Sequence, residues 1–314
     1  MVSDAISRRR FIEDLALAGG VVLMGGRAAR SERGSRGKLH VACNQYPWTV
    51  FYARDNRNFN ADLDEGLGEL AACRLDGYEP LASNPQEIDR LAPLLKKHGL
   101  EMRSLYVNSI LHEREKADQS IEAVLAIARK AKAVGTKIIV TNPSPIRWGG
   151  PQNKNDAELR VQAAALEKLG RELRTIGLTL AYHNHDIELR NAAREFHHMI
   201  VGTDPKYVTL CLDAHWVYRG AGNSQVALFD VLKLYGSRIT ELHLRQSKDN
   251  IWTETMCDGD IDYPALAKHL LEIGVRPHIV LEQAVEKGTP KTMTTVEAFQ
   301  KSSRYTRRVF AEFA

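Results

Sequence analysis

The sequence predicts an α/β protein that folds as one (β/α)₈ barrel, and three observations predict this fold class. Short β-rich runs alternate eight times with longer helical patterns, as repeated βα units do. Four of the helical patterns end in a glycine just before the next strand, a common way for helices to end. The 314 residues are also long enough for such a barrel, which takes roughly 250 residues.

The strands are predicted from short apolar runs that are followed by polar residues. In chain order they are 39–43, 77–79, 102–107, 137–141, 178–182, 208–213, 239–244 and 278–281. The helices between them are predicted at 64–74, 85–98, 118–134, 156–176, 192–201, 225–235, 263–273 and 294–312. The terminating glycines are Gly99, Gly135, Gly177 and Gly274, and Asp262 is expected to cap the helix that starts at residue 263.

A doubly wound parallel sheet is the alternative fold. That fold favours a glycine-rich phosphate loop after the first strand, whereas residues 44–48 read NQYPW. No low-complexity linker divides the chain. We therefore expect a leader over residues 1–36 and a single barrel domain over residues 37–314.

The leader has the order of features that an export signal requires. Arg8, Arg9 and Arg10 precede Phe11 and a modest apolar run that is too short to span a bilayer. The paired arginines resemble the twin-arginine signal, which is a receptor-read address. This implies bacterial twin-arginine export to the periplasm or outside the cell, and an uncleaved leader would tether the protein to the inner membrane.

The charge balance argues against a nucleic-acid partner. The net charge is +4, and residues 1–36 hold seven arginines against four acidic residues, so the rest of the chain is almost neutral. It has no dense basic block of the kind that binds polyanions. Its apolar runs are shorter than a membrane span, so no stable span is expected in the mature form. The four cysteines form no C-x-x-C pair and are expected to be mostly buried.

Polar residues collect where the predicted strands end. In a (β/α)₈ barrel the active site lies at the carboxyl ends of the strands, so these positions are the candidates for chemistry. They are Glu79, Asn108, Asn142, His183, Asn184, His185, Asp213, His215, His243 and Glu282. Each of these residues alone has a simple structural explanation, such as capping a helix. All of them are expected at the same end of the barrel, however, and this convergence indicates a functional site.

Strand parity selects a metal site from these candidates. Side chains alternate along a strand, and Leu210 and Leu212 are expected to face the helices, which turns Asp213 into the barrel. The same parity turns His243, Glu282 and the pair His183 and His185 inward. A mixed nitrogen and oxygen set of this kind suits Mn²⁺, Co²⁺, Zn²⁺ or Mg²⁺.

These residues resemble the xylose isomerase-like barrels, the sugar phosphate isomerase/epimerase superfamily, over essentially the whole chain after the leader. The resemblance rests on the segments YHNHDIE at 182–188, LDAHW at 212–216, ELHL at 241–244, GDIDY at 259–263 and VLE at 280–282. The first segment is most similar to the branch that contains inosose dehydratase and enzymes of 3-keto-sugars.

The resemblance implies a metal held by Glu, Asp, His and Glu from strands five to eight. Asp213, His243 and Glu282 match the last three positions, but imidazole replaces the first glutamate. The fourth ligand therefore stays open between His183 and His185, with Glu188 as a third choice. We assign His183 to the metal set, and His185, Glu188 and His215 to proton transfer.

The chemistry expected of such a site is proton abstraction next to a sugar carbonyl through an enediolate. Isomerisation or epimerisation is the leading expectation, and 3-keto-sugar lysis or inosose-type dehydration is the alternative. An AP endonuclease or a non-catalytic sugar-binding barrel fits less well. A sugar is the expected ligand, a homo-oligomer is expected from the resemblance, and the substrate-binding candidates are Glu79, Asn108, Asn142, Trp216, Lys248 and Glu254.

Overall fold

A computed structural model describes residues 38–314 of the chain. The expected leader of residues 1–36, with its twin-arginine motif, lies outside the described residues. None of the helices within residues 38–314 is both long and apolar enough to cross a membrane.

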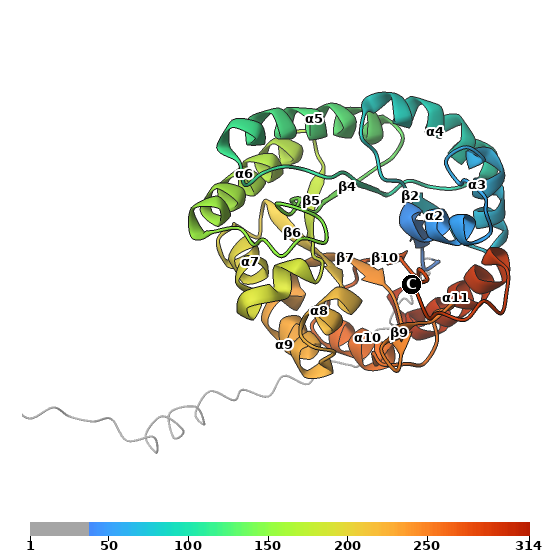
Figure 1. Ribbon diagram of the computed structural model, residues 1–314. Helices are drawn as coiled ribbons and strands as arrows, with labels where there is room; N and C mark the ends of the chain where they lie inside the picture. The colour runs from blue at the N-terminus through green and yellow to red at the C-terminus, as the bar shows by residue number, and fades with distance from the viewer. Residues whose placement is uncertain (1–37) are drawn as a thin grey trace, which may run out of the picture. The chain divides into compact units, whose positions relative to one another are not determined.

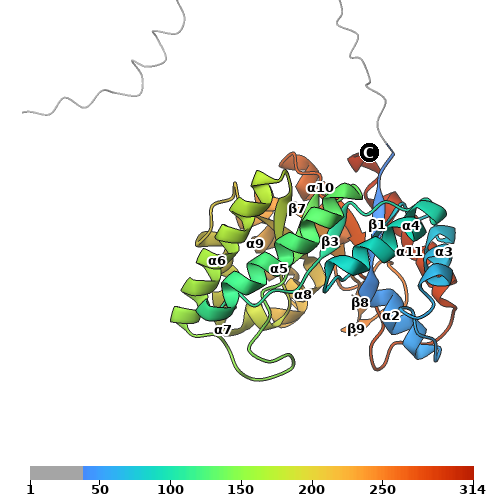
Figure 2. The same ribbon diagram turned by 90° about the horizontal axis from the view of Figure 1, so that it is seen from above.

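Eight parallel strands form a nearly closed barrel, and the helices surround it as a ring (Figures 1 and 2). The strands are paired in the order β2-β1-β10-β7-β6-β5-β4-β3. Two isolated bridges, Gly77 to Glu101 and Leu81 to Tyr106, join the two ends of this order. The prediction of a (β/α)₈ barrel is therefore confirmed.

The observed strands lie where the sequence predicts them, within a few residues at each end. Their bounds are β1 (Val41–Asn44), β2 (Gly77–Glu79), β3 (Ser104–Tyr106), β4 (Ile138–Thr141), β5 (Thr179–His183), β6 (Val208–Asp213), β7 (Ile239–Leu244) and β10 (His278–Leu281).

The eight predicted helices are also present. They are α3 (Leu63–Ala72), α4 (Pro85–His98), α5 (Arg114–Ala133), α6 (Asp156–Thr175), α7 (Arg190–Val201), α9 (Gln225–Tyr235), α10 (Tyr263–Glu272) and α11 (Thr295–Val309). Gly99, Gly135, Gly177 and Gly274 all have positive φ, as the chain reversal after a helix requires. The Asp262 side chain accepts a hydrogen bond from the Ala265 amide, so the predicted cap is confirmed.

Several further elements follow strand ends, where the sequence pattern predicts neither a helix nor a strand. Residues 44–48 begin α2 (Gln45–Arg54), because the Asn44 side chain accepts a hydrogen bond from the Tyr46 amide. Asp213 likewise caps α8 (Ala214–Gly220). The loop after β7 contains a hairpin of β8 (Ser247–Lys248) and β9 (Ile251–Trp252), and one-turn 3₁₀ helices are η1 (Ile187–Leu189), η2 (Gly236–Arg238) and η3 (Ala311–Phe313).

The parity predicted for the strands is confirmed by their packing. Leu210, Leu212 and Tyr182 belong to the apolar layer between strands and helices. The barrel interior holds a much smaller apolar cluster of Tyr106, Val140, Ala181 and Cys211. Branched apolar side chains usually fill such an interior, but here buried charged and imidazole groups occupy much of it.

The cysteines are unpaired, and three of the four are buried. Cys43, Cys73 and Cys211 are buried and Cys257 is partly exposed. They behave mostly as small apolar residues, as expected.

Candidate functional site

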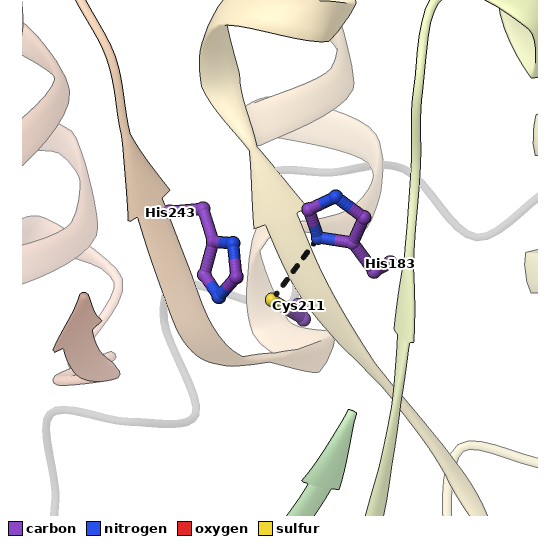
Figure 3. A group of neighbouring side chains, drawn as sticks. All are labelled: His183, Cys211 and His243. Carbon is purple, nitrogen blue, oxygen red and sulfur yellow. Dashed lines mark hydrogen bonds between the residues drawn. The ribbon is translucent and has the colours of Figure 1, made fainter. Parts of the chain in front are cut away.

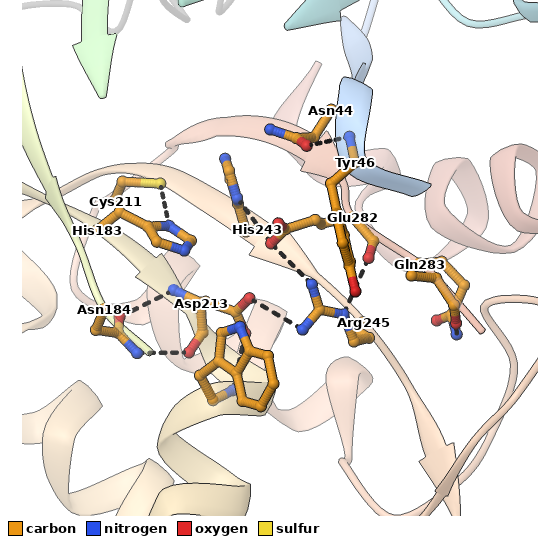
Figure 4. A network of polar contacts seen from close by, with 12 residues as sticks. Asn44, Tyr46, His183, Asn184, Cys211, Asp213, His243, Arg245, Glu282 and Gln283 are labelled. Atoms are coloured by element: carbon orange, nitrogen blue, oxygen red, sulfur yellow. Dashed lines mark hydrogen bonds and ion pairs between the residues drawn. The ribbon is translucent and has the colours of Figure 1, made fainter. Parts of the chain in front are cut away.

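The candidate site is built from side chains at the carboxyl ends of β5, β6, β7 and β10. The side-chain amide of Asn184 joins the ends of β5 and β6. Its Nδ2 donates to the Asp213 carbonyl and its Oδ1 accepts from the Asp213 backbone amide, both at 3.1 Å (Figure 4). Asp213 uses Oδ1 to cap α8, through the Trp216 amide at 2.8 Å. The other carboxylate oxygen of Asp213, Oδ2, makes no hydrogen bond with any residue that the structure describes and remains available to a ligand in the candidate site.

Three buried residues offer ligands for a divalent cation. One ligand atom each from His183, Asp213 and Glu282 lie within 4.8 Å of one another. Among the described residues, His183 Nε2 and Asp213 Oδ2 are buried and have no hydrogen-bond partner. An unsatisfied buried polar atom costs about 1–3 kcal/mol, which cation binding would offset. The donor set therefore fits a divalent metal ion.

His243 lies against this set and contacts carboxylates at both ring nitrogens. Its Nδ1 is 3.1 Å from Glu282 Oε2, and its Nε2 is 3.1 Å from both Glu79 Oε2 and Glu241 Oε1. Carboxylates that face one ring nitrogen fix the orientation of the other, a common arrangement around metal-binding histidines. The structure thus places His243 beside Glu282, next to the set formed by His183, Asp213 and Glu282.

The Cys211 side chain lies next to the imidazole rings of His183 and His243 (Figure 3). Its Sγ is 3.6 Å from His183 Nδ1, and the two imidazole rings have centroids 4.8 Å apart. Burial raises the pKa of the Cys211 thiol and lowers the pKa of His183, so both groups are neutral at pH 7. The Cys211 contact occupies Nδ1 and leaves Nε2 of His183 available.

Arg245 is the main site residue that strand-end reasoning from the sequence missed. It is 1% exposed, and its Nη2 lies 3.1 Å from Glu282 Oε2 while Nη1 lies 3.8 Å from Asp213 Oδ2 (Figure 4). The guanidinium also lies over the rings of Trp216 and Trp252, 4.9 and 4.4 Å from their centroids. Arg245 therefore holds two expected metal ligands in place.

The charge of Arg245 acts differently on those two carboxyl groups. Burial raises the pKa of Asp213 to about 7, although Arg245 opposes the shift. Burial would also raise the pKa of Glu282, but Arg245 and His243 outweigh it and hold this pKa well below 4.5. Glu282 is therefore the anion that neutralises Arg245.

A pocket of about 360 Å³ opens above these residues. Glu282 and His185 lie in its wall, together with Asn108, Tyr106 and Trp148. His185 is half-buried, its ring packs edge-on against Trp148 at 5.0 Å, and its Nδ1 has no hydrogen-bond partner within residues 38–314. Burial lowers the pKa of His185 to about 4, so the ring is neutral at pH 7. His185 is thus the candidate base that reaches the pocket.

The other two proton-transfer candidates lie away from the pocket wall. Glu188 is fully buried and accepts hydrogen bonds from Asn142 Nδ2 at 3.1 Å and the His185 amide at 2.6 Å. Burial and the nearby Glu195 raise the pKa of Glu188 to about 7. His215 contacts Ser247 Oγ at 3.1 Å, and burial, assisted by Arg245, lowers its pKa to about 2.

The six substrate-binding candidates are spread over several environments. Asn108 lines the pocket, and the half-buried Trp216 packs 5.8 Å from the His185 ring. Asn142 and Glu79 are fully buried beneath the pocket, where Asn142 also bonds the His183 carbonyl and Glu79 accepts from Asn44 Nδ2 at 2.6 Å.

The remaining two candidates belong to the loop after β7 and do not line the pocket. Lys248 is exposed in the hairpin of β8 and β9. Glu254 is bound by Arg54 at 2.8 Å and by Thr292 Oγ1 at 2.6 Å, which joins three segments of the fold.

Glu241 is a second missed residue, and the sequence did carry a signal for it. Residues 241, 243 and 245 share one parity on β7 and its extension, so an inward His243 implies an inward Glu241 and Arg245. Glu241 is fully buried, and its Oε2 lies 3.0 Å from His278 Nδ1. A mid-strand carboxylate of this kind is missed when only the strand ends are considered.

A family model described as the xylose isomerase-like TIM barrel matches residues 69–308. Among curated proteins, the chain is similar to an inosose dehydratase of Clostridium perfringens, with 23% identity over 249 residues. That alignment covers 70% of this chain and 82% of the dehydratase.

Solved structures resemble the whole barrel. A sugar phosphate isomerase/epimerase from Parabacteroides distasonis aligns with a TM-score of 0.66 and 19% identity, covering 92% of this chain and 99% of that one. A xylose isomerase-like TIM barrel protein from Mycobacterium smegmatis in complex with magnesium aligns with a TM-score of 0.68 and 14% identity, covering 88% and 98%.

Proposed function

The chain belongs to the xylose isomerase-like TIM barrel family, and we propose that it is a divalent-metal-dependent enzyme that removes a proton from the carbon next to a sugar carbonyl. One observation carries this proposal. The unpartnered His183 Nε2 and Asp213 Oδ2 converge with Glu282 directly below a pocket whose wall contains His185. A cation-binding set and a proton acceptor thus meet at one cavity.

The residues that would hold the ion are His183, Asp213, His243 and Glu282. A bound divalent cation supplies Lewis-acid polarisation of a carbonyl oxygen. The chain itself contributes His185, whose ring faces the pocket and can accept a proton from a sugar carbon. Trp148 packs against this ring, and both Tyr106 and Trp148 line the pocket and offer apolar faces to a sugar.

Two outcomes complete the reaction after the proton has moved to His185. In the first outcome the sugar carbon skeleton is kept: returning this proton from His185 to the neighbouring carbon gives an isomer, whereas protonation of the opposite face of the first carbon by solvent gives an epimer, and His185 then releases its proton to solvent. In the second outcome a β-hydroxyl or β-alkoxyl group takes the proton from His185 and leaves as water or an alcohol, which gives an unsaturated keto-sugar. The second candidate function, elimination, is favoured by the similarity to inosose dehydratases.

A sugar without a phosphate group suits the pocket. Within the described part of the chain, the residues lining it include no lysine or arginine, whereas a sugar phosphate needs donors for a dianion. The twin-arginine export proposed for residues 1–36 agrees with this, because sugar phosphates are intracellular metabolites.

Proton NMR in D₂O tests the proposal directly. The full-length chain is loaded in turn with Mn²⁺, Co²⁺, Zn²⁺ and Mg²⁺ and incubated with free aldoses, ketoses, keto-inositols and 3-keto-glucosides. We expect deuterium at the carbon next to the carbonyl, with either a new sugar or an unsaturated product. Asp213→Asn should lose both the exchange and the bound metal measured by elemental analysis.

The products separate the two candidate functions. A new sugar identifies an isomerase or epimerase, and an unsaturated keto-sugar with released water or aglycone identifies a lyase. Absence of exchange with every ligand, in protein that retains its metal, would overturn the proposed function.

A further inference from the structure

A second hollow adjoins the pocket above His185. It has a volume of about 260 Å³ and lies over the segment that joins β2 to α4. Gln45, Asn60 and Leu81 line both hollows and so form the boundary between them. A ligand seated on His185 and Glu282 can therefore continue across this boundary.

The boundary is already held in place by hydrogen bonds. Gln45 Nε2 donates to Asn60 Oδ1 at 3.0 Å, and Gln45 Oε1 accepts from the Leu81 amide at 2.9 Å. Leu81 is itself 42% exposed and presents an apolar face between the two hollows. A ligand crossing it meets a preformed surface, which reduces the entropy lost on binding.

The adjoining hollow combines polar walls with an apolar floor. Ile88 and Leu91 form buried parts of the floor, and Ser83, Glu87 and Arg90 contribute polar walls. The carboxylate of Glu87 is fixed because its two oxygens accept from the Ser83 amide and from Asn84 Nδ2, both at 2.9 Å. Donors and acceptors over an apolar floor match a sugar ring, which has polar edges and apolar faces.

The exposed aromatic residues lie on the side of the reacting ring instead, whereas Tyr78 in the adjoining hollow is buried. Trp148 is 53% exposed and Tyr46 is 45% exposed, and both line the pocket that contains His185. Large exposed aromatic side chains around one cavity mark a ligand-binding surface. The two hollows thus offer different surroundings to two parts of one ligand.

We propose that the adjoining hollow is a second sugar subsite, so that the substrate is a glycoside of at least two rings rather than a free monosaccharide. The reacting ring, which must carry the carbonyl that the proposed reaction requires, occupies the pocket above His185, and the ring linked to it lies against Leu81, Glu87 and Arg90. This inference rests on the proposed function, because it takes the pocket above His185 as the place of the reacting ring.

Paired ligands that differ only in the second ring test the subsite. Isothermal titration of the full-length, Mn²⁺-loaded protein compares methyl β-glucoside with cellobiose, methyl α-glucoside with maltose, and methyl β-galactoside with lactose. In at least one pair we expect the disaccharide to bind about tenfold tighter, a change of roughly 1.4 kcal/mol. Phenyl β-glucoside supplies a ring without hydroxyl groups and should gain less than cellobiose.

A variant that fills the adjoining hollow tests whether the affinity gain of the disaccharide arises there. Ser83 is exposed and its side chain borders the hollow, so Ser83→Trp should fill the hollow and remove the disaccharide advantage while leaving methyl glycoside binding unchanged. Ala164→Trp, an exposed position on α6, is the matched control and should keep the advantage.

Equal affinities within every pair, an advantage that survives Ser83→Trp, or an equal gain for phenyl β-glucoside would overturn the assignment. These readouts require binding alone. Failure of the deuterium exchange experiment would instead overturn the proposed reaction and leave the comparison of paired ligands standing, so the two failures are distinguishable.

Discussion

His183 and His185 lie two residues apart on the same side of the chain, yet they meet different surroundings. His183 is fully buried between Cys211 and His243, whereas His185 is half-buried beside Trp148 in the pocket wall. Burial excludes a sugar from His183 but leaves one nitrogen for a cation. In the proposed function, this geometry suits His183 to the ligand role and His185 to proton transfer.

Substitution of these histidines should give two different losses. His185→Gln should keep its metal affinity and lose about 10²–10⁴-fold in deuterium exchange, the usual contribution of a general base. His183→Gln should weaken metal binding by more than about 100-fold, since even an outer partner of a ligand is worth roughly 10- to 100-fold. Metal titration together with exchange rates checks both, and normal metal binding in His183→Gln would contradict the assignment.

Glu241 contacts His243, and in the proposed function it acts on the metal site through this histidine. Glu241→Gln replaces an anionic acceptor for His243 Nε2 at almost constant volume, so we expect about 10- to 100-fold weaker metal binding without loss of the fold. Metal titration and far-ultraviolet circular dichroism measure the two properties. Glu172→Gln, exposed on α6, is the control, and equal affinity in both variants would refute the positioning role.

At the scale of elements, the first turn of α7 departs from ordinary helical geometry. Asn191, Ala192 and Ala193 have φ of 53°, 58° and 56°, which is the left-handed region. Residues with a Cβ are destabilised there by about 1–2 kcal/mol, and asparagine tolerates it best. The sequence pattern predicts a helix from residue 192, whereas residues 191–193, which follow η1, take left-handed backbone values.

Ala192→Gly should therefore stabilise the protein, contrary to the usual effect of glycine in a helix. We expect about 0.5–1 kcal/mol more stability, because glycine relieves the strain and loses part of the gain to its greater unfolded entropy. Ala123→Gly, exposed in the regular helix α5, should cost about 1 kcal/mol. Urea unfolding compares the two, and the same sign of effect in both would contradict the strain at Ala192.

For the whole molecule, Asp76 joins the first strand to the last helix. Its carboxylate accepts from the Val41 amide at 3.0 Å, from Lys38 Nζ and from Arg307 on α11. Burial raises the pKa of Asp76, but the bonds from Lys38, Arg307 and Val41 outweigh it and hold this pKa below 3.8. The Asp76 carboxylate thus links β1, the first strand of the barrel, to α11, its last helix.

The stability that Asp76 contributes should depend on pH with a definite sign. A depressed carboxyl pKa stabilises the fold above the unfolded pKa of about 3.9, and this contribution is lost as pH falls through the folded value. Asp76→Asn should cost about 1–3 kcal/mol at pH 7, and the difference from wild type should shrink as pH falls below the unfolded pKa and through the lower folded one. Asp89→Asn, which removes an exposed ion pair with Lys130, should cost less than about 1 kcal/mol.

Denaturant unfolding from pH 7 to the acid limit measures this dependence. A cost of Asp76→Asn that stays constant with pH would show that the carboxylate charge is not what stabilises the junction.

The sequence by itself determined the barrel and, for β5, β6, β7 and β10, the side of the strand that faces inward. Alternation along a strand is a local property with a period of two, so the apolar residues Leu210 and Leu212 already imply an inward Asp213. The carboxyl ends of parallel barrel strands share one face, and for this reason local alternation is enough to bring His183, His243 and Glu282 to one mouth.

Only the tertiary structure decided which of the polar residues reach the pocket. Glu254 is bound to Arg54 and Thr292, and His215 contacts Ser247 and Trp252, through contacts between segments far apart in the sequence. Burial between Trp216, Trp252 and two carboxylates likewise gives Arg245 its role. Local periodicity carries no information about such contacts, because they depend on how separate loops fold over the mouth of the barrel.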